Sequence, residues 1–202
     1  MPDKEIEVKL ELSSEEQIGG IEEFLAPYCQ GPWQDVVMRA VYYDTEDSFF
    51  QQHRIAYRVR QEDDIFVATY KSGQINEHGA FERVEINKIV STIEPDISVF
   101  AQTAVWEQLV ASKDAKFVPV VITDFKRHSA YINWGDSIME VAIDLGFVQG
   151  KDKQAPIFEL ELELTAGEQS DLVELEMLLS ERFEIKPSLI SKYKKGLILA
   201  GL

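Results

Sequence analysis

The segment Glu5-Ile6-Glu7-Val8-Lys9 alternates charged and branched apolar side chains near the start of the chain. Successive side chains on a β-strand point to opposite faces, so Glu5, Glu7 and Lys9 would share one face. The same alternation returns far downstream in Phe158-Glu159-Leu160-Glu161-Leu162-Glu163-Leu164. The sequence therefore predicts two strands that each present a row of carboxylates on one side and large apolar groups on the other.

Rows of carboxylates repel one another unless cations lie between them, and other segments of strand character supply such cations. Tyr57-Arg58-Val59-Arg60 places two arginines on one face, and Lys71, Arg83 and Arg127 lie on further segments. A polar face that combines Glu with Arg and Lys predicts a lumen that binds an anion together with its divalent metal. The alternative for each single motif is a solvated strand face with surface ion pairs.

Length and composition are those of one domain, expected to span residues 1–202. The hydrophobic fraction is 45% of 202 residues, enough for a sizeable core. The sequence contains no apolar run long enough to cross a bilayer, and its charged start predicts no signal peptide. A single cysteine, Cys29, excludes an intrachain disulfide. These features predict a cytoplasmic protein with no membrane partner.

The formal net charge of −16 argues against nucleic-acid binding, which requires basic patches for phosphate contacts. It does not argue against a small polyanionic substrate. Net charge governs solubility and long-range steering, whereas a binding site acts through local charges. Much of the acidity lies in surface-like segments such as residues 174–181.

Hydrophobic periodicity and turn residues predict strands that dominate the middle of the chain, with helices interspersed. A capping box from Ser13 or Ser14 to Glu16 or Gln17 opens the first helix, which Pro27 ends. Trp134-Gly135-Asp136 and residues 62–64 are expected hairpin turns. The expected strands are 34–45, 54–60, 65–71, 81–89, 117–123, 125–134, 137–145 and 158–164; the loops are 73–79 and 149–153; the later helices are 103–112, 168–183 and 188–199.

The ordered set of motifs resembles the CYTH superfamily, also called triphosphate tunnel metalloenzymes. The N-terminal Glu-x-Glu-x-Lys is a weak signal alone, but further matches follow in family order over nearly the whole chain. The closest resemblance is to the N-terminal domain of bacterial inorganic triphosphatases. The further matches are Tyr42-Tyr43-Asp44-Thr45, Tyr57-Arg58-Val59-Arg60, Lys71, Glu82-Arg83-Val84-Glu85, Asp124-Phe125-Lys126-Arg127, Glu140-Val141-Ala142-Ile143-Asp144, Glu159 to Glu163, and Ser191-Lys192-Tyr193-Lys194-Lys195-Gly196.

The resemblance implies an α+β fold built on a closed antiparallel β-barrel, the triphosphate tunnel, with helices around it. The charged strand faces would line the lumen, and the helices or a second subunit would cover the apolar faces outside. It also implies metal-dependent hydrolysis of tripolyphosphate to pyrophosphate and phosphate. Periodicity alone does not predict closure of the barrel.

Basic side chains are expected to bind the phosphates, because arginine presents a planar fork of donors and lysine a point charge. Lys195 stands where the family often has arginine, and Arg83 with Glu85 could form only a same-face ion pair. Lys192 and Lys195 could equally form a cationic helix end. The expected phosphate-binding residues are Lys9, Arg58, Arg60, Lys71, Arg83, Arg127, Lys192 and Lys195.

Carboxylates are expected to hold Mg²⁺ or Mn²⁺, which prefer hard oxygen ligands. Glu5 and Glu161 are the expected groups that position or deprotonate the attacking water, with Lys9 as the third catalytic residue. The pattern does not assign one carboxylate to metal and another to water. The expected metal ligands are Glu5, Glu7, Glu140, Asp144, Glu159, Glu161 and Glu163.

The same fold hosts adenylate cyclases of the fourth class and thiamine triphosphatases, so the substrate stays open between tripolyphosphate, ATP and thiamine triphosphate. A non-catalytic polyphosphate-binding module is a further alternative, although anion binding alone needs few carboxylates. Exposed apolar strand faces would make a homodimer possible.

Overall fold

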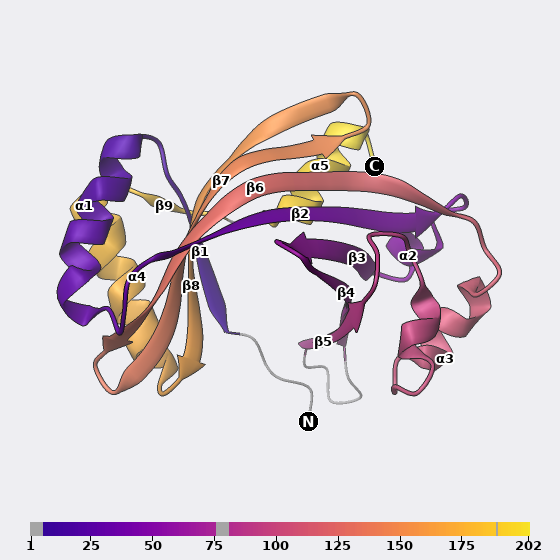
Figure 1. Cartoon of the computed structure of the whole chain (residues 1–202), viewed down its shortest axis with the longest axis horizontal. Helices are drawn as coiled ribbons and strands as arrows, with labels where there is room; N and C mark the ends of the chain where they lie inside the picture. Colours follow the sequence, from indigo (N-terminus) through magenta and orange to yellow (C-terminus); the bar gives the residue numbers. More distant parts are fainter. Residues whose placement is uncertain (1–5, 76–80, 189) are drawn as a thin grey trace.

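The computed structural model describes residues 6–75, 81–188 and 190–202, with the side chains of residues 74, 75 and 81–83 outside that description. Figure 1 shows one curled sheet with helices at both ends. The elements are β1 (Glu7–Glu11), α1 (Glu15–Leu25), η1 (Ala26–Tyr28), β2 (Gln34–Thr45), α2 (Phe49–Gln52), β3 (Ile55–Glu62), β4 (Ile65–Ile75), β5 (Phe81–Val90), η2 (Ile97–Phe100), α3 (Trp106–Leu109), η3 (Val110–Ser112), β6 (Phe117–Trp134), β7 (Ser137–Gly150), β8 (Lys153–Ala166), α4 (Gln169–Phe183), β9 (Lys186–Pro187) and α5 (Lys192–Ala200), where η marks a 3₁₀ turn.

The strands pair antiparallel in the order β5-β4-β3-β2-β6-β7-β8-β1-β9. No pairing joins β5 to β9 within the described residues, so the sheet is not closed by hydrogen bonds there. The α+β class is confirmed, and closure of a barrel is not. The sheet is nevertheless curled, with β3, β4 and β5 lying beneath the arch formed by β2, β6 and β7 (Figure 1).

Alternation of side chains gives the sheet one charged face and one largely apolar face. The apolar face of β1, β6, β7 and β8 packs against α1 and α4 around buried Leu10, Leu160 and Leu175. The apolar face of β2, β3 and β4 packs against α2, η2 and α3 around buried Tyr57, Tyr70 and Phe100. The expectation that helices cover outward-facing apolar strand surfaces is therefore confirmed for these two regions.

The fifth helix lies on the opposite, charged side of the sheet. Leu197 of α5 packs with Tyr42, Phe125 and Val148, which project from β2, β6 and β7. Two glycines permit this close approach, because a Cβ on Gly150 would lie 2.0 Å from the backbone oxygen of Gly196. The position of α5 therefore requires a glycine at the end of β7, namely Gly150.

Several expected boundaries were correct, and the first helix is the clearest case. Helix α1 begins at Glu15, and the Gln17 side chain accepts a hydrogen bond from the Ser14 backbone N–H at 3.2 Å. Strand β2 has the expected bounds, and the hairpins turn at Asp63 and Gly135, which both have positive φ.

Other boundaries were wrong, mostly where long strands continue through polar residues. Residues 117–134 form one strand, not two, because ladder hydrogen bonds continue through Asp124. The expected loop 73–79 begins instead as strand to Ile75, and residues 76–80 lie outside the described part. The expected helix 103–112 is only one α-turn at Trp106–Leu109 between 3₁₀ turns, and the last helix starts at Lys192, after β9.

We expect Gly150→Ala to lower the free energy of unfolding by about 1–3 kcal/mol, because the new methyl group must push the α5 backbone away. Gly19→Ala in α1 is the matched control, since a Cβ there meets nothing within 4 Å and should stabilise the helix by up to about 1 kcal/mol. Urea unfolding measures both. Equal stability of the two variants would contradict this packing of α5.

Candidate functional site

The charged face gathers carboxylates on β1, β7 and β8 and basic groups on β3, β4, β6 and α5. The strand register arranges the carboxylates in rows across neighbouring strands. Glu140 is opposite Glu163, which is opposite Glu7; one row further, Glu161 is opposite Lys9. In the third row, Arg127 is opposite Asp144, which is opposite Glu159. Alternation along each strand therefore places these groups on one surface.

Glu161 is the centre of an ion-pair network. Its carboxylate accepts hydrogen bonds from Lys9 Nζ at 2.9 Å, Lys192 Nζ at 2.7 Å and Arg127 Nη2 at 2.5 Å. Lys9 also donates to Glu7 at 2.6 Å. Burial disfavours the ionised carboxyl, but Lys192, Lys9 and Arg127 overcome this and hold the pKa of Glu161 well below its usual range.

Asp144 is fully buried and anchors two cations. Arg127 donates to it in a bidentate pair, Nε to Oδ1 at 2.8 Å and Nη2 to Oδ2 at 2.7 Å. Lys192 Nζ lies 2.8 Å from Asp144 Oδ2 and 2.8 Å from Glu159 Oε2. Burial lowers the pKa of Arg127 and of Lys192, but these acidic neighbours outweigh it, so both pKa values are raised and both cations stay charged.

Two other carboxylates of the charged face are less well compensated. Glu159 is buried, and among the described residues neither of its oxygens has a hydrogen-bond partner; the ion pair with Lys192 lacks hydrogen-bond geometry. Burial and then the charges of Glu140 and Glu7 raise the pKa of Glu163. Like charges directly opposite each other destabilise a sheet. This part of the face is therefore suited to a cation with oxygen ligands.

The basic residues of β3 and β4 show the opposite charge imbalance, an excess of positive charge. Burial and then the neighbouring charge of Arg58 lower the pKa of Arg60, although Glu62 pairs with it, and Arg127 adds to the repulsion. The Nε–H of Arg60 is buried without a hydrogen-bond partner among the described residues. Lys71 Nζ pairs with Glu85 at 2.6 Å. The Arg60 guanidinium, with this buried N–H group and a neighbouring arginine, is suited to an anion.

Tyr42 contributes a hydroxyl group to this face that the motif analysis did not assign. It accepts a hydrogen bond from Arg58 Nη1 at 3.2 Å, and its ring stacks on Tyr193 of α5 with centroids 4.8 Å apart. Burial raises the pKa of Tyr42, but the cations Arg58, Lys71 and Lys192 outweigh it, so the pKa is lowered. Its even-numbered position on β2, in register with Arg58, is the signal that could have identified it.

Not every expected site residue enters this arrangement. Glu5 and the Arg83 side chain lie outside the described residues; the backbone of Arg83 is in β5 opposite Gly73. Lys195 Nζ donates to the backbone oxygen of Pro156 at 3.0 Å instead of to the carboxylate network. Glu62 and Glu85, which the motifs did not assign to the site, also lie on the charged face, where Glu62 pairs with Arg60 and Glu85 with Lys71.

The described residues fit a divalent metal in donor chemistry, although no three of their His, Cys, Asp or Glu side chains converge into a complete metal cluster. Mg²⁺ and Mn²⁺ usually take a few carboxylates and complete their shells with substrate phosphates and water. The mutually repelling row of Glu7, Glu163 and Glu140 and the Glu159 carboxylate, whose ion pair with Lys192 lacks hydrogen-bond geometry, are such groups. Glu5, an expected member, lies outside the part that the structure describes.

Comparison with known proteins now identifies the family. The family model of the CYTH domain matches residues 3–196. The chain belongs to the CYTH family. A curated relative, an inorganic triphosphatase of Haemophilus influenzae, is 32% identical in an alignment 202 residues long. The alignment covers 98% of this chain and 55% of the relative. The chain therefore spans about half the length of the relative it matches.

Solved structures show the same fold at lower identity. A putative adenylyl cyclase from Hippeastrum, described as having a dominant triphosphatase activity, matches with a TM-score of 0.64 and 19% identity, over 96% of this chain and 95% of that one. A putative adenylate cyclase from Bacillus halodurans matches with a TM-score of 0.57 and 20% identity, over 94% of each chain. At this identity the likeness supports the CYTH fold and not a substrate. No described helix is both long enough and apolar enough to cross a membrane.

We expect opposite stability effects from two neighbouring glutamates of β8. Glu161→Gln should destabilise the fold at pH 7 by on the order of 3 kcal/mol, because three cations lose a buried partner. Glu163→Gln should stabilise it by up to about 1 kcal/mol, because it removes repulsion from Glu140 and Glu7. Urea unfolding at pH 7 measures both changes.

The two glutamates should affect stability in opposite ways as pH falls. The folded pKa of Glu161 is lowered, so its contribution is present above the unfolded pKa and is lost as pH falls through the folded value. The folded pKa of Glu163 is raised, so its neutral form stabilises below the unfolded pKa, and this contribution is lost as pH rises through the folded value. The Glu163→Gln advantage should therefore fade on acidification, and an advantage that grew instead would contradict the assignment.

Proposed function

We propose that this CYTH domain hydrolyses linear inorganic triphosphate to pyrophosphate and phosphate with the help of Mg²⁺ or Mn²⁺. One observation carries the proposal: a single sheet face holds Arg58 and Arg60 on β3 and a row of three glutamates directly opposite one another on β1, β8 and β7. The Nε–H of Arg60 is buried without a hydrogen-bond partner among the described residues. A metal–triphosphate complex has both charges in one ligand. The triphosphatase relative supports the choice of substrate, and CYTH triphosphatases are in general metal-dependent.

The basic residues would bind and orient the phosphates. Arg58 and Arg60 on β3 and Lys71 on β4 would bind one part of the triphosphate. Arg127 on β6, Lys9 on β1 and Lys192 on α5 would bind another part. Arg83 and Lys195 are further members of the proposed set. Their charges would stabilise the negative charge that spreads over the transferred phosphoryl group in the transition state.

The carboxylates of β1, β7 and β8 would hold the metal, namely Glu5, Glu7, Glu140, Asp144, Glu159, Glu161 and Glu163. Bound there, a divalent metal would supply charge neutralisation of phosphate oxygens and acidification of water. Glu161, paired with three cations, is a weak base in this state and is suited to orienting the water with Glu5. If phosphate draws Lys9, Arg127 and Lys192 away from Glu161, its basicity rises.

The shape of the charged face favours a small linear anion over a nucleotide. Helix α5 fills one region of this face with apolar side chains around Leu197, and Tyr193 stacks on Tyr42 beside the basic residues. We infer that these groups leave less room for a base or thiazolium ring at that end of the charged face. ATP and thiamine triphosphate remain the competing substrates to be tested.

The decisive experiment is to measure phosphate release from tripolyphosphate, ATP and thiamine triphosphate in parallel, with Mg²⁺, Mn²⁺ or excess chelator, and to assay the ATP reaction for cyclic AMP. We expect metal-dependent release that is fastest with tripolyphosphate. Cyclic AMP with pyrophosphate would indicate a cyclase instead. Tight triphosphate binding without turnover would indicate a non-catalytic polyphosphate-binding module.

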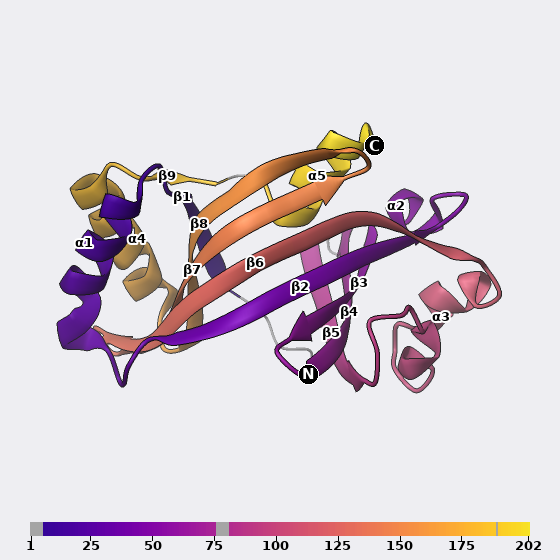
Figure 2. The same ribbon diagram turned by 45° about the horizontal axis from the view of Figure 1, so that its top comes forward.

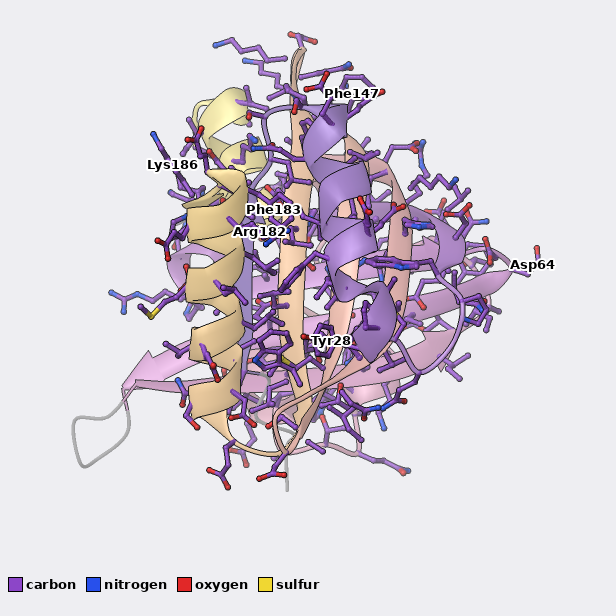
Figure 3. All side chains as sticks on the ribbon, turned by 90° about the vertical axis from the view of Figure 1, so that its left-hand side faces the viewer. Tyr28, Asp64, Phe147, Arg182, Phe183 and Lys186 are labelled. Carbon is purple, nitrogen blue, oxygen red and sulfur yellow. The ribbon has the colours of Figure 1, made fainter. Side chains whose placement is uncertain are left out.

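Arginine variants connect this activity to the charged face. Arg60→Ala should lower kcat/KM for tripolyphosphate by at least tenfold, the effect of losing one charge-assisted hydrogen bond of about 1.5–3 kcal/mol. Arg182→Ala is the matched control. Figure 3 shows Arg182 beside Phe183 between α1 and α4, and its guanidinium lies 5.0 Å from the ring centroid of Phe24, on the apolar side of the sheet. Equal losses in both variants would argue against the face as the substrate site.

Metal binding can be tested without turnover. Mn²⁺ should raise the thermal unfolding midpoint of the wild type, because a ligand that binds only the folded state stabilises it and would relieve the repulsion among Glu7, Glu163 and Glu140. The increase should be smaller in Glu163→Gln and unchanged in a surface control, Glu46→Gln, whose carboxylate pairs with exposed Lys116. A midpoint that Mn²⁺ does not change would contradict the proposed ligand set.

A further inference from the structure

A second network of polar side chains crosses the basic part of the charged face, where β3, β4 and β5 lie side by side (Figures 1 and 2). Thr69 on β4 is directly opposite Arg58 on β3 and directly opposite Asn87 on β5. In the next row along the same face, Lys71 on β4 is opposite Glu85 on β5. Thr69 and Asn87 therefore lie among the residues proposed to bind phosphate, although both are uncharged and no motif includes them.

Three contacts join Thr69 to Lys71 by way of the neighbouring strand. Thr69 Oγ1 donates to Asn87 Oδ1 at 2.7 Å, and Asn87 Nδ2 donates to Glu85 Oε1 at 3.1 Å. The other oxygen of that carboxylate, Oε2, lies 2.6 Å from Lys71 Nζ. The chain of contacts thus leaves β4, crosses to β5 and returns to β4 two residues further along, where it ends on a cation.

The chemistry of each group fixes the direction of these hydrogen bonds. A carboxylate only accepts hydrogen bonds, so Asn87 must turn its NH₂ group toward Glu85. Its carbonyl oxygen then faces Thr69, whose hydroxyl must donate. Asparagine is among the residues that strands disfavour, and joining this hydroxyl to this carboxylate is the role that the structure gives Asn87 in β5.

Burial fixes the first member of the chain of contacts. Thr69 is 0% exposed, and buried hydroxyl groups in folded proteins are almost always hydrogen-bonded. Turning the Asn87 amide away would break the hydrogen bond of this buried hydroxyl, which costs more than breaking a hydrogen bond in water. The amide is therefore held in the orientation that donates to Glu85.

The last member, Lys71, needs such support because its side chain is long and 36% exposed. An isolated lysine–glutamate pair at a partly exposed position is weak, since holding two long side chains in one geometry costs conformational entropy. Here Glu85 is engaged at both oxygens, by Asn87 at Oε1 and by Lys71 at Oε2. The ammonium group is thereby held on the charged face before any ligand arrives.

We propose that Asn87 and Thr69 are positioning residues for Lys71. They hold the Glu85 carboxylate, and this carboxylate holds the ammonium group where a phosphate can reach it. Neither residue touches the substrate, so both act only through the lysine, by lowering the entropy that Lys71 must lose on binding. This role rests on the proposed function, in which Lys71 binds a phosphate of the substrate.

The first test needs no substrate and measures ¹⁵N relaxation of the lysine ammonium groups. The order parameter of Lys71 Nζ in the wild type should exceed that of Lys113, whose side chain is 57% exposed. Asn87→Ala and Thr69→Val should lower it toward the value for Lys113. Thr69→Ser, which keeps the hydroxyl, should preserve it. An order parameter that neither Asn87→Ala nor Thr69→Val changes overturns the proposal.

Gln149→Ala is the matched control for Asn87→Ala. Gln149 is likewise an exposed amide on a strand, but its side chain donates to the backbone oxygen of Lys151 at 3.1 Å. It alternates with Val148 of the charged side, so it lies on the other side of the sheet. The control should change neither the Lys71 order parameter nor turnover, and circular dichroism checks that each variant is folded.

The second test is a double-mutant cycle on tripolyphosphate turnover. Asn87→Ala and Thr69→Val should each lower kcat/KM about three- to tenfold, the range expected for the loss of one intramolecular hydrogen bond. In a Lys71→Ala background, Asn87→Ala should cause no further loss, because its effect passes through the lysine. An equal further loss in that background would show that Asn87 acts in another way, and it would also overturn the proposal.

The two tests separate this role from the proposed function. A wild type that does not turn over tripolyphosphate, with order parameters that change as expected, would refute the proposed function while Asn87 and Thr69 still position Lys71. Turnover of tripolyphosphate with order parameters that do not change would refute the positioning role alone.

Discussion

Repulsion between like charges on one face of a sheet is the constraint on which this structure depends. Glu7, Glu163 and Glu140 lie directly opposite one another on three strands, and Arg58 and Arg60 share one face of β3, where the charge of Arg58 lowers the pKa of buried Arg60 further. Each arrangement alone disfavours folding. The cost is offset on the other side of the sheet, where two apolar clusters under α1, α4, α2 and α3 bury large side chains.

The cations that relieve this repulsion come from distant parts of the chain. Lys9 is on the first strand, Arg127 on the sixth, and Lys192 on the last helix, yet all three donate to Glu161. Lys192 reaches the carboxylates because α5 packs on the charged face, and α5 can approach because Gly150 and Gly196 lack side chains. Two glycines that take no part in the ion pairs thus help to place a buried lysine among three acids.

Alternation along single strands could be predicted from the sequence, and with it the charged face itself. Glu7, Lys9, Arg58, Arg60, Asp144 and the three glutamates of β8 share that face because each strand is regular. The motif Tyr42-Tyr43-Asp44-Thr45 was harder, since its members divide: Tyr42 lies on the charged face, Tyr43 in an apolar cluster, and Asp44 accepts hydrogen bonds from the backbone N–H groups of Phe50 and Gln51. Alternation separates Tyr42 from Tyr43, but the spacing carries no sign of the hydrogen bonds that Asp44 accepts.

Contacts set by tertiary structure could not be predicted. Lys192 and Lys195 are one helical turn apart, but only Lys192 enters the carboxylate network, because Lys195 meets the end of β8 at Pro156. Curling of the sheet likewise depends on which helices pack on which part of it. Periodicity within one strand determines its two faces, but not what covers either of them.

The ion pairs of the charged face imply that its two halves respond together to ligands. Lys9, Arg127 and Lys192 are held by Glu161, Asp144, Glu159 and Glu7, which are the groups proposed to hold the metal. A metal that takes carboxylate oxygens leaves those cations without partners, and an anion that takes the cations leaves the carboxylates without partners. Because an uncompensated buried charge costs several kcal/mol, on the order of 3, each ligand lowers the cost of binding the other. The network therefore favours a metal and a polyphosphate bound as a pair over either one alone.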